Sequence, residues 1–184
     1  MAIPDISNIN TVPKLFWHNV ENYSDDITMW RKQRGVWESH TWGDYGNWSR
    51  DIGHALIAQG LKSGDKISII SETRIEWVVL DMAIMGIGCI TAPVYPSNTE
   101  EQVKYIVKHS ESKVVFAEDQ EQLDKMLVIW KDLPMVKKIV VIDKYYPRNL
   151  PNVISLDGYR DLGQLHRGEN KGKFEERLKL VKPT

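Results

Sequence analysis

The sequence predicts an α/β protein: a mainly parallel sheet with helices on both faces, preceded by an aromatic-rich β-hairpin. Short apolar runs of strand length alternate with helical patterns of about 10–15 residues, which is typical of βαβ units. Residues 114–117 and 139–142 are apolar throughout, as expected for strands covered on both faces. The composition, with 42% hydrophobic and 27% charged residues, excludes wholesale disorder, collagen-like repeats and a disulfide scaffold.

The first third of the chain is rich in tryptophan and predicts a β-hairpin over about residues 27–42, with Gly35 in the turn. Five of the seven tryptophans lie there: Trp17, Trp30, Trp37, Trp42 and Trp48. Thr41, with Asp44 three residues later, predicts the start of a helix that Gly60 ends. The helical spacing predicts that three consecutive polar residues of this helix face solvent: Ser49, Arg50 and Asp51.

Strands and helices alternate after this first helix. The strands are expected at residues 66–71, 89–95, 113–117, 137–143 and 152–156, and the helices at residues 74–86, 99–109, 120–133 and about 159–165. We therefore expect an amino-terminal α/β subdomain over residues 1–167, with its βαβ units at about residues 66–156. Residues 168–184 are expected to be a linker or marginal helix that leads to a missing remainder of the protein.

The loops that follow the strands are the candidate ligand sites, because open α/β sheets bind ligands at the carboxyl ends of their strands. The loops at residues 71–74, 96–99 and 118–120 contain no glycine and match no phosphate-binding loop. Gly86 and Gly88 form a Gly-x-Gly pattern, but they follow a helix and precede a strand, the reverse of the order in a dinucleotide site. We interpret them as a helix stop.

The reactive side chains of the sequence form no catalytic pattern. The five histidines lack metal-ligand spacing: His18, His40, His54, His109 and His166. Cys89, the single cysteine, is interpreted as a small buried hydrophobe, and Ser71 and Thr73 as helix caps. Asp81 lies in an apolar helix, where we expect it to pair with a backbone group or a Lys or Arg; a functional role with a shifted pKa is the alternative. The sequence therefore predicts no catalytic, cofactor-binding or metal-binding residue.

The charge balance argues against a nucleic-acid binder. Lys and Arg number 24 and Asp and Glu 25, a formal net charge of −1. The basic residues Arg31, Lys32 and Arg34 are interpreted as a solvated hairpin turn. The chain begins without the basic region of a signal peptide, and prolines interrupt its longest uncharged stretch, residues 82–99, so neither a signal peptide nor a transmembrane segment is expected. A single cysteine fits a reducing compartment.

Several strings occur in order over about residues 15–145: Gly35-Val-Trp37, Thr41-Trp-Gly-Asp-Tyr45, Ala55-Leu-Ile-Ala-Gln-Gly-Leu61, Gly64-Asp-Lys-Ile-Ser-Ile-Ile70, Glu76-Trp77 with Asp81, and Gly86 and Gly88 with Ala92-Pro-Val-Tyr-Pro-Ser97. Together they resemble the amino-terminal part of the AMP-forming acyl-CoA synthetases, most closely the long-chain-fatty-acid–CoA ligases of the adenylate-forming superfamily. The resemblance implies that the sequence is a partial amino-terminal subdomain of such an enzyme.

The resemblance implies a two-step activation of a fatty acid. ATP and the carboxylate give an acyl-adenylate and pyrophosphate, coenzyme A then displaces AMP, and Mg²⁺ accompanies the ATP. The phosphate loop, the Mg²⁺-binding glutamate, the ribose-binding aspartate and the carboxyl-terminal lysine of the family all come later than Thr184, so no site residue is carried over and this portion is expected to be inactive alone.

The resemblance also implies a cytoplasmic enzyme, in solution or peripheral to a membrane, with no nucleic-acid partner. Unpaired strand edges of this portion would favour self-association. Two alternatives stay open: the same superfamily with a different carboxylic acid substrate, and a non-catalytic α/β binding or interaction domain.

Overall fold

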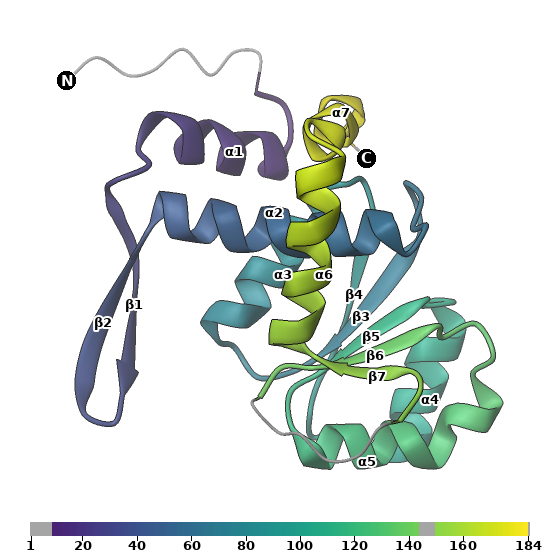
Figure 1. The fold of residues 1–184 in the computed structure, drawn as a ribbon. Coiled ribbons are helices and arrows are strands. Elements are labelled where there is room, and N and C mark those ends of the chain that lie inside the picture. Colours follow the sequence, from purple (N-terminus) through teal and green to yellow (C-terminus); the bar gives the residue numbers. More distant parts are fainter. Residues whose placement is uncertain (1–8, 144–149, 184) are drawn as a thin grey trace.

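Five parallel strands form one sheet with helices on both faces in the computed structural model, which describes residues 9–143 and 150–183 (Figure 1). The strands are β3 (Lys66–Ile70), β4 (Ile90–Val94), β5 (Val114–Ala117), β6 (Lys138–Val141) and β7 (Val153–Ser155). They lie in the order β4-β3-β5-β6-β7, and all neighbours are parallel. The predicted α/β class is confirmed, and each strand falls within the residues predicted for it.

The chain reverses its direction across the sheet at β3. It leaves β3 to form β4 on one side and then returns past β3 to form β5 on the other. Ile67 of β3 is therefore paired with Thr91 of β4 and with Val114 of β5. Open α/β sheets bind ligands at the carboxyl ends of the strands where the order reverses. The loops after β3 and β5 are thus the first place to look for a site.

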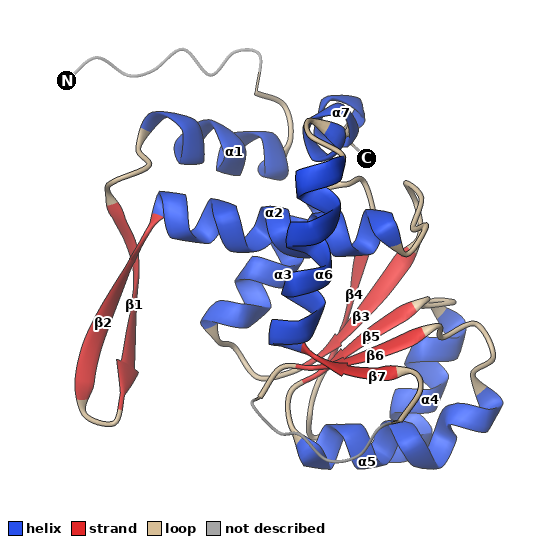
Figure 2. Ribbon diagram, viewed as in Figure 1, coloured by secondary structure: helices blue, strands red, loops and turns tan. Residues whose placement is uncertain are grey.

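Alternate side chains of the strands enter two hydrophobic cores, one on each face of the sheet. Ile67, Ile69 and Phe116 belong to the core beneath α2 (Trp42–Ala58), α3 (Ile75–Gly86) and α6 (Leu156–Glu169). Ile70 and Val115 belong to the core beneath α4 (Glu100–His109) and α5 (Gln120–Ile129), which continues as a short 3-10 helix, Trp130–Asp132. Figure 2 shows the two helical layers on opposite sides of the strands. A sheet covered on both faces explains why its strands are continuous apolar runs.

The predicted hairpin is formed by β1 (Ile27–Gln33) and β2 (Val36–Thr41) and extends away from the sheet (Figure 1). Arg34 and Gly35 close its turn with φ angles of 49° and 83°. Two successive positive φ angles are typical of the type I′ turn, whose twist matches that of the strands. Thr41 then begins α2 with a capping box shared with Asp44, as predicted. Gly60, with a φ angle of 79°, lies just after the end of α2.

The helix α1 (Val12–Asn22) was not predicted, and α6 is longer than expected. The hydroxyl of Thr11 caps α1, which buries Phe16 against the start of α2 and Trp17 against Phe174. Ser155 accepts a hydrogen bond from the N–H of Gly158 and so begins α6 before residue 159. In both cases a hydroxyl residue supplies the signal for the helix start.

The helix α7 (Lys173–Leu180) lies in the segment expected to be a linker or marginal helix, and it is docked on the protein. Phe174 is fully buried. The guanidinium of Arg177 donates hydrogen bonds to the carbonyl oxygens of Ile87 (Nη2–O 2.6 Å) and Leu61 (Nη1–O 3.1 Å). Phe174 and Arg177 thus anchor this helix, and Leu178 packs at the margin of the same core. The division of the chain at residue 168 stays a prediction.

The uncharged stretch at residues 82–99 forms the end of α3, the predicted helix stop and β4. Gly88 has a φ angle of 76°, which favours glycine after a helix. Among residues 9–143 and 150–183, every helix falls short of the length and apolarity needed to cross a bilayer.

Candidate functional site

The loops after β3 and β5 lie side by side at the carboxyl edge of the sheet, where Arg74 contacts three carboxylates. Its Nε lies 2.8 Å from Oε2 of Glu76, and its Nη1 lies 3.2 Å from Oε1 of Glu118 and 2.7 Å from Oδ1 of Asp143. Arg31 of the hairpin reaches the same group, with its Nη1 3.2 Å from Oε1 of Glu76. We call these five residues the carboxyl-edge cluster.

The two cations and three carboxylates of the carboxyl-edge cluster are paired with one another. Burial alone would raise the pKa of Glu76, but hydrogen bonding and charge from Arg74, with the charge of Arg31, hold it below its ordinary value. Burial opposes the charge of Arg74, but Glu76 and Asp143 raise its pKa further above the ordinary range. A phosphate placed at this edge would meet three carboxylates. The adjoining cavity, of about 330 Å³, is therefore a poor site for a nucleotide triphosphate.

The carboxyl-edge cluster is expected to stabilise the hairpin and the sheet edge against unfolding. Replacing Arg74 with glutamine leaves three neighbouring carboxylates without their common cation, so we expect the free energy of unfolding to fall by about 1–2 kcal/mol. Urea denaturation at low and high salt measures this loss, which added salt should reduce because it screens the remaining repulsion. Arg34→Gln, in the exposed hairpin turn, is the matched control. Equal stabilities of the two variants would contradict the structural role of Arg74.

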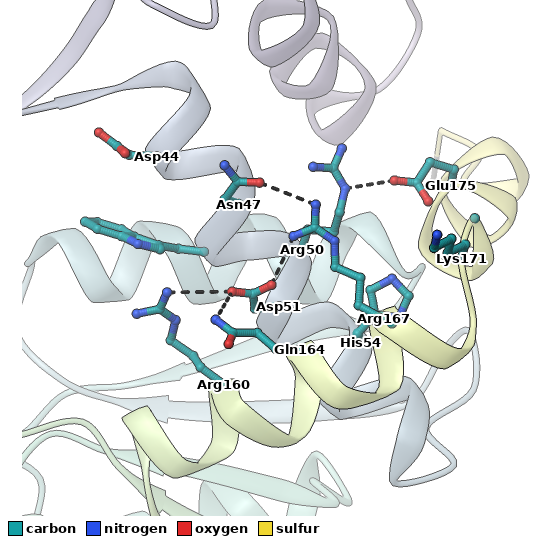
Figure 3. Close-up of a pocket in the computed structure, with 13 residues that line it drawn as sticks. Asp44, Asn47, Arg50, Asp51, His54, Arg160, Gln164, Arg167, Lys171 and Glu175 are labelled. Carbon is teal, nitrogen blue, oxygen red and sulfur yellow. Dashed lines mark hydrogen bonds and ion pairs between the residues drawn. The ribbon is translucent and has the colours of Figure 1, made fainter.

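A second and larger cavity, of about 890 Å³, lies between α2, α6 and α7 (Figure 3). We call it the α2–α6 cavity. Ser49 and Asp51, expected to face solvent, are buried, so that prediction was wrong for both. Ser49 donates to the carbonyl oxygen of Val79 in α3 (3.1 Å), whereas Asp51 lines this cavity. The carboxylate of Asp51 accepts a hydrogen bond from Nε2 of Gln164 (2.9 Å) and lies near Nη1 of Arg167 (3.1 Å) and Nη2 of Arg160 (3.6 Å). Asp51 of α2 therefore faces α6 rather than water.

The close approach of α6 to α2 explains why Asp51 is enclosed. Gly163 of α6 has no side chain, and a Cβ atom there would lie 1.8 Å from the carbonyl oxygen of Asp51. The two helices therefore touch backbone to backbone, and the long side chains on either side of the contact close over the Asp51 carboxylate. Helical periodicity within α2 could not show this, because the covering residues come more than 100 positions later.

The structure brings together two of the five histidines, His54 of α2 and His166 of α6. Their Nδ1 atoms lie 2.9 Å apart, so one ring donates a hydrogen bond to the other. Burial lowers the pKa of His54 to about 4, helped by His166 and by the charges of Arg167 and Arg50, while Glu175 acts in the opposite direction. His54 is thus held neutral in the folded protein at neutral pH.

Stability is expected to fall in mild acid because of His54. The folded chain keeps His54 unprotonated down to about pH 4, whereas an unfolded histidine takes up its proton near pH 6.5. The unfolded chain therefore binds more protons between these values, and the free energy of unfolding should drop by about 2 kcal/mol from pH 7 to pH 5. Denaturation of wild type, His54→Asn and the exposed control His109→Asn across this range measures it. An unchanged slope in His54→Asn would contradict the assignment.

The remaining single residues of interest lie apart from these cavities. Cys89 is buried as interpreted, burial raises its pKa to about 12, and its thiol contacts the carbonyl oxygen of Lys62. Ser71 donates to its neighbour's carbonyl oxygen, and Arg74 is the N-cap residue of α3 and makes no side-chain cap hydrogen bond, so the predicted caps at Ser71 and Thr73 were wrong. No three His, Cys, Asp or Glu side chains form a metal-binding group within the described ranges.

Asp81 of α3 pairs with a hydroxyl rather than with the backbone group or cation that was expected. The Thr91 hydroxyl donates to Oδ1 of Asp81 across 2.6 Å. Burial raises the pKa of Asp81, and the hydrogen bond from Thr91 partly opposes that rise. The pair joins α3 to the edge strand β4, and no second titratable group shares a hydrogen bond with it among the described residues.

Comparison with known proteins relates residues 16–164 to the profile of the family described as AMP-binding enzyme. The long-chain-fatty-acid–CoA ligase FadD15 of Mycobacterium tuberculosis is 29% identical over 156 residues, 85% of this chain and 26% of that protein. The human long-chain-fatty-acid–CoA ligase ACSBG1 is 27% identical over 153 residues, 83% of this chain and 21% of that protein. The chain thus spans about a quarter of the length of the curated relatives it matches.

Solved structures show the same fold. A crystal structure of the anthranilate CoA ligase AuaEII in complex with anthranoyl-AMP matches 81% of this chain and 27% of that protein, with a TM-score of 0.73 and 21% identity. The coronafacic acid ligase from Pectobacterium brasiliense matches 81% of this chain and 29% of that protein, with a TM-score of 0.72 and 18% identity.

Proposed function

This chain belongs to the AMP-binding enzyme family, and we propose that it is the amino-terminal scaffold of a long-chain-fatty-acid–CoA ligase. The reaction would convert a fatty acid, ATP and coenzyme A into acyl-CoA, AMP and pyrophosphate through an acyl-adenylate. The observation on which the proposal rests is the family match over residues 16–164, which includes the hairpin, α2 and the whole parallel sheet. The printed names of the curated relatives support the choice of a long-chain acid.

The residues described here would support the reaction by holding other parts of the enzyme in place, rather than by taking part in the chemical steps. The sheet, its two cores and the docked α7 form a rigid body against which further catalytic elements can be placed. The carboxyl-edge cluster joins the hairpin to this body through Arg31 and Glu76. Rigid placement of substrates and catalytic groups is a large part of the catalysis of group transfer.

ATP with Mg²⁺ does not fit the cavity at the carboxyl edge of the sheet. Two of its acidic residues, Glu76 and Asp143, are already paired with Arg74, and the loops of the described chain that end at this edge lack a glycine cradle. We therefore derive no step through Mg²⁺ on these residues. The groups that hold the triphosphate would come from outside the described residues.

The test is an activity assay with palmitate, ATP, Mg²⁺ and coenzyme A. We expect no acyl-adenylate from the 184-residue chain. A chimera in which this chain replaces the matched part of the Mycobacterium tuberculosis relative should make palmitoyl-CoA. Turnover by the chain alone would contradict the scaffold role. A chimera that folds, by circular dichroism and by cooperative melting, but makes no acyl-adenylate would contradict the ligase assignment.

A further inference from the structure

Positively charged side chains gather around the α2–α6 cavity, although the chain as a whole has a formal charge of −1. The cations that line it are Arg50, Arg160, Arg167 and Lys171. Three acids line it as well: Asp44, Asp51 and Glu175. Asp44 accepts the backbone N–H of Thr41 in the capping box of α2, so it is already engaged at the helix start. The cavity therefore has a local excess of positive charge.

The three acids leave the four cations with a formal excess of one positive charge. Glu175 pairs with Arg50, whose Nε lies 2.8 Å from its Oε1. Asp51 is shared between Arg167 and Arg160, at 3.1 Å and 3.6 Å. His54 adds no charge at neutral pH, because it is held in its neutral form. Like charges that face one cavity without enough acids between them favour the binding of an anion.

Arg160 has a hydrogen-bond donor without an acceptor. Its Nε is buried and has no partner in the described part of the chain. The guanidinium is held over the ring of Trp48, with its Cζ 5.7 Å from the ring centroid, which fixes its orientation before any ligand arrives. A guanidinium presents two parallel N–H groups that match an oxyanion.

Lys171 gives the other end of the cavity a mobile cation. It lies between α6 and α7, is exposed, and forms no salt bridge within the described residues (Figure 3). The flexible lysine side chain allows its ammonium group to adjust its position to a bound phosphate. Arg160 and Lys171 thus offer one fixed and one adaptable cation around the same space.

We propose that the α2–α6 cavity binds a small organic molecule through a phosphate group. A phosphate group offers more acceptor oxygens to the guanidinium and ammonium groups than a single carboxylate does. The cavity volume, about 890 Å³, is in the range of sites for small organic ligands, and Trp48 supplies an apolar wall for the rest of the molecule. This site goes beyond the ligase proposal and rests on the cavity residues alone.

The test uses inorganic phosphate and phenyl phosphate as probes and the backbone amide and Trp indole NMR signals of the chain as readout. We expect saturable shifts of signals from Trp48 and residues 167–172, with phenyl phosphate binding more tightly than phosphate. Arg160→Gln should weaken both by about tenfold. Arg160→Lys, which keeps the charge but loses the paired N–H groups, should also weaken binding. Arg34→Gln should not.

Matched control variants distinguish binding at this site from nonspecific electrostatic attraction of the anion to the protein. Lys171→Gln should weaken binding several-fold, whereas Lys173→Gln, two residues away and paired with Glu176, should not. The proposal is overturned if the shifts are absent, if potassium chloride or benzoate at equal ionic strength reproduces them, or if they persist in a folded Arg160→Gln protein. None of these results would affect the ligase assay, which depends on other residues.

Discussion

Replacing Gly163 with alanine is expected to lower the free energy of unfolding by more than about 3 kcal/mol. A Cβ atom at this position would lie 1.8 Å from the carbonyl oxygen of Asp51 and 3.1 Å from the amide nitrogen of Ala55. Both are backbone atoms in the middle of α2, so neither can rotate away. The helices must separate, which opens the core beneath them and disrupts the hydrogen bonds to the Asp51 carboxylate. Urea denaturation followed by circular dichroism measures the loss.

Gly168→Ala is the matched control for Gly163→Ala, because Gly168 also lies in α6 and has no atom within 4 Å of its Cβ position. Alanine favours a helix over glycine, so this variant should be unchanged or more stable by up to about 1 kcal/mol. The same glycine-to-alanine change in the same helix is thus expected to lower the free energy of unfolding at position 163 but not at position 168. This difference isolates the contact between α2 and α6. Equal stabilities of the two variants would show that α2 and α6 do not touch at Gly163.

Patterns along the chain were sufficient to predict the sheet and most of its helices. Residues 114–117 and 139–142 are apolar throughout, because β5 and β6 are covered on both faces, and this pattern is visible without knowledge of the neighbours. Thr41 and Thr99 mark helix starts by capping boxes, a signal contained within four residues. Local chemistry of this kind can be read from a single sequence.

Contacts between distant segments were not predictable in the same way. Asp51 is polar and sits between polar neighbours, so it was expected to face solvent, yet α6 covers it. The partner of Asp81 was not predicted for the same reason, because Thr91 lies on a separate element, β4. The caps expected at Ser71 and Thr73 are also absent, and Arg74 is at the N-cap of α3 instead. Tertiary packing overrides local preference at these positions.

The same distinction between local motifs and contacts of distant segments applies to the candidate sites. The lack of a glycine loop after β3 and β5 could be predicted because such a loop is a contiguous motif. The α2–α6 cavity could not, because Arg50 and Arg160 are brought together only when α6 docks on α2. The glycine at position 163 is the one signal in the sequence, and without the fold it is indistinguishable from Gly158 or Gly168 in the same helix.

Replacing Phe174 with alanine is expected to release α7 from the body of the protein. The Phe174 ring fills a slot between two glycines: a Cβ at Gly53 would lie 2.3 Å from it, and one at Gly86 2.7 Å. The Trp17 ring, 4.9 Å away between centroids, closes the slot. Removal of a fully buried phenyl ring should cost about 3–5 kcal/mol. Because an isolated helix of eight residues is unstable in water, α7 should then unfold rather than stay docked.

Hydrogen exchange distinguishes this local release from global unfolding. In Phe174→Ala the amides of α7 should lose protection while those of β3 and β5 keep most of theirs, since the slot lies at the edge of the core and not beneath the sheet. Leu180→Ala, in the same helix but with its side chain 73% exposed, should leave α7 protected. Full protection of α7 in Phe174→Ala would mean that Arg177, through its bonds to Leu61 and Ile87, is sufficient to hold the helix. Docking would then depend on polar contacts rather than on burial.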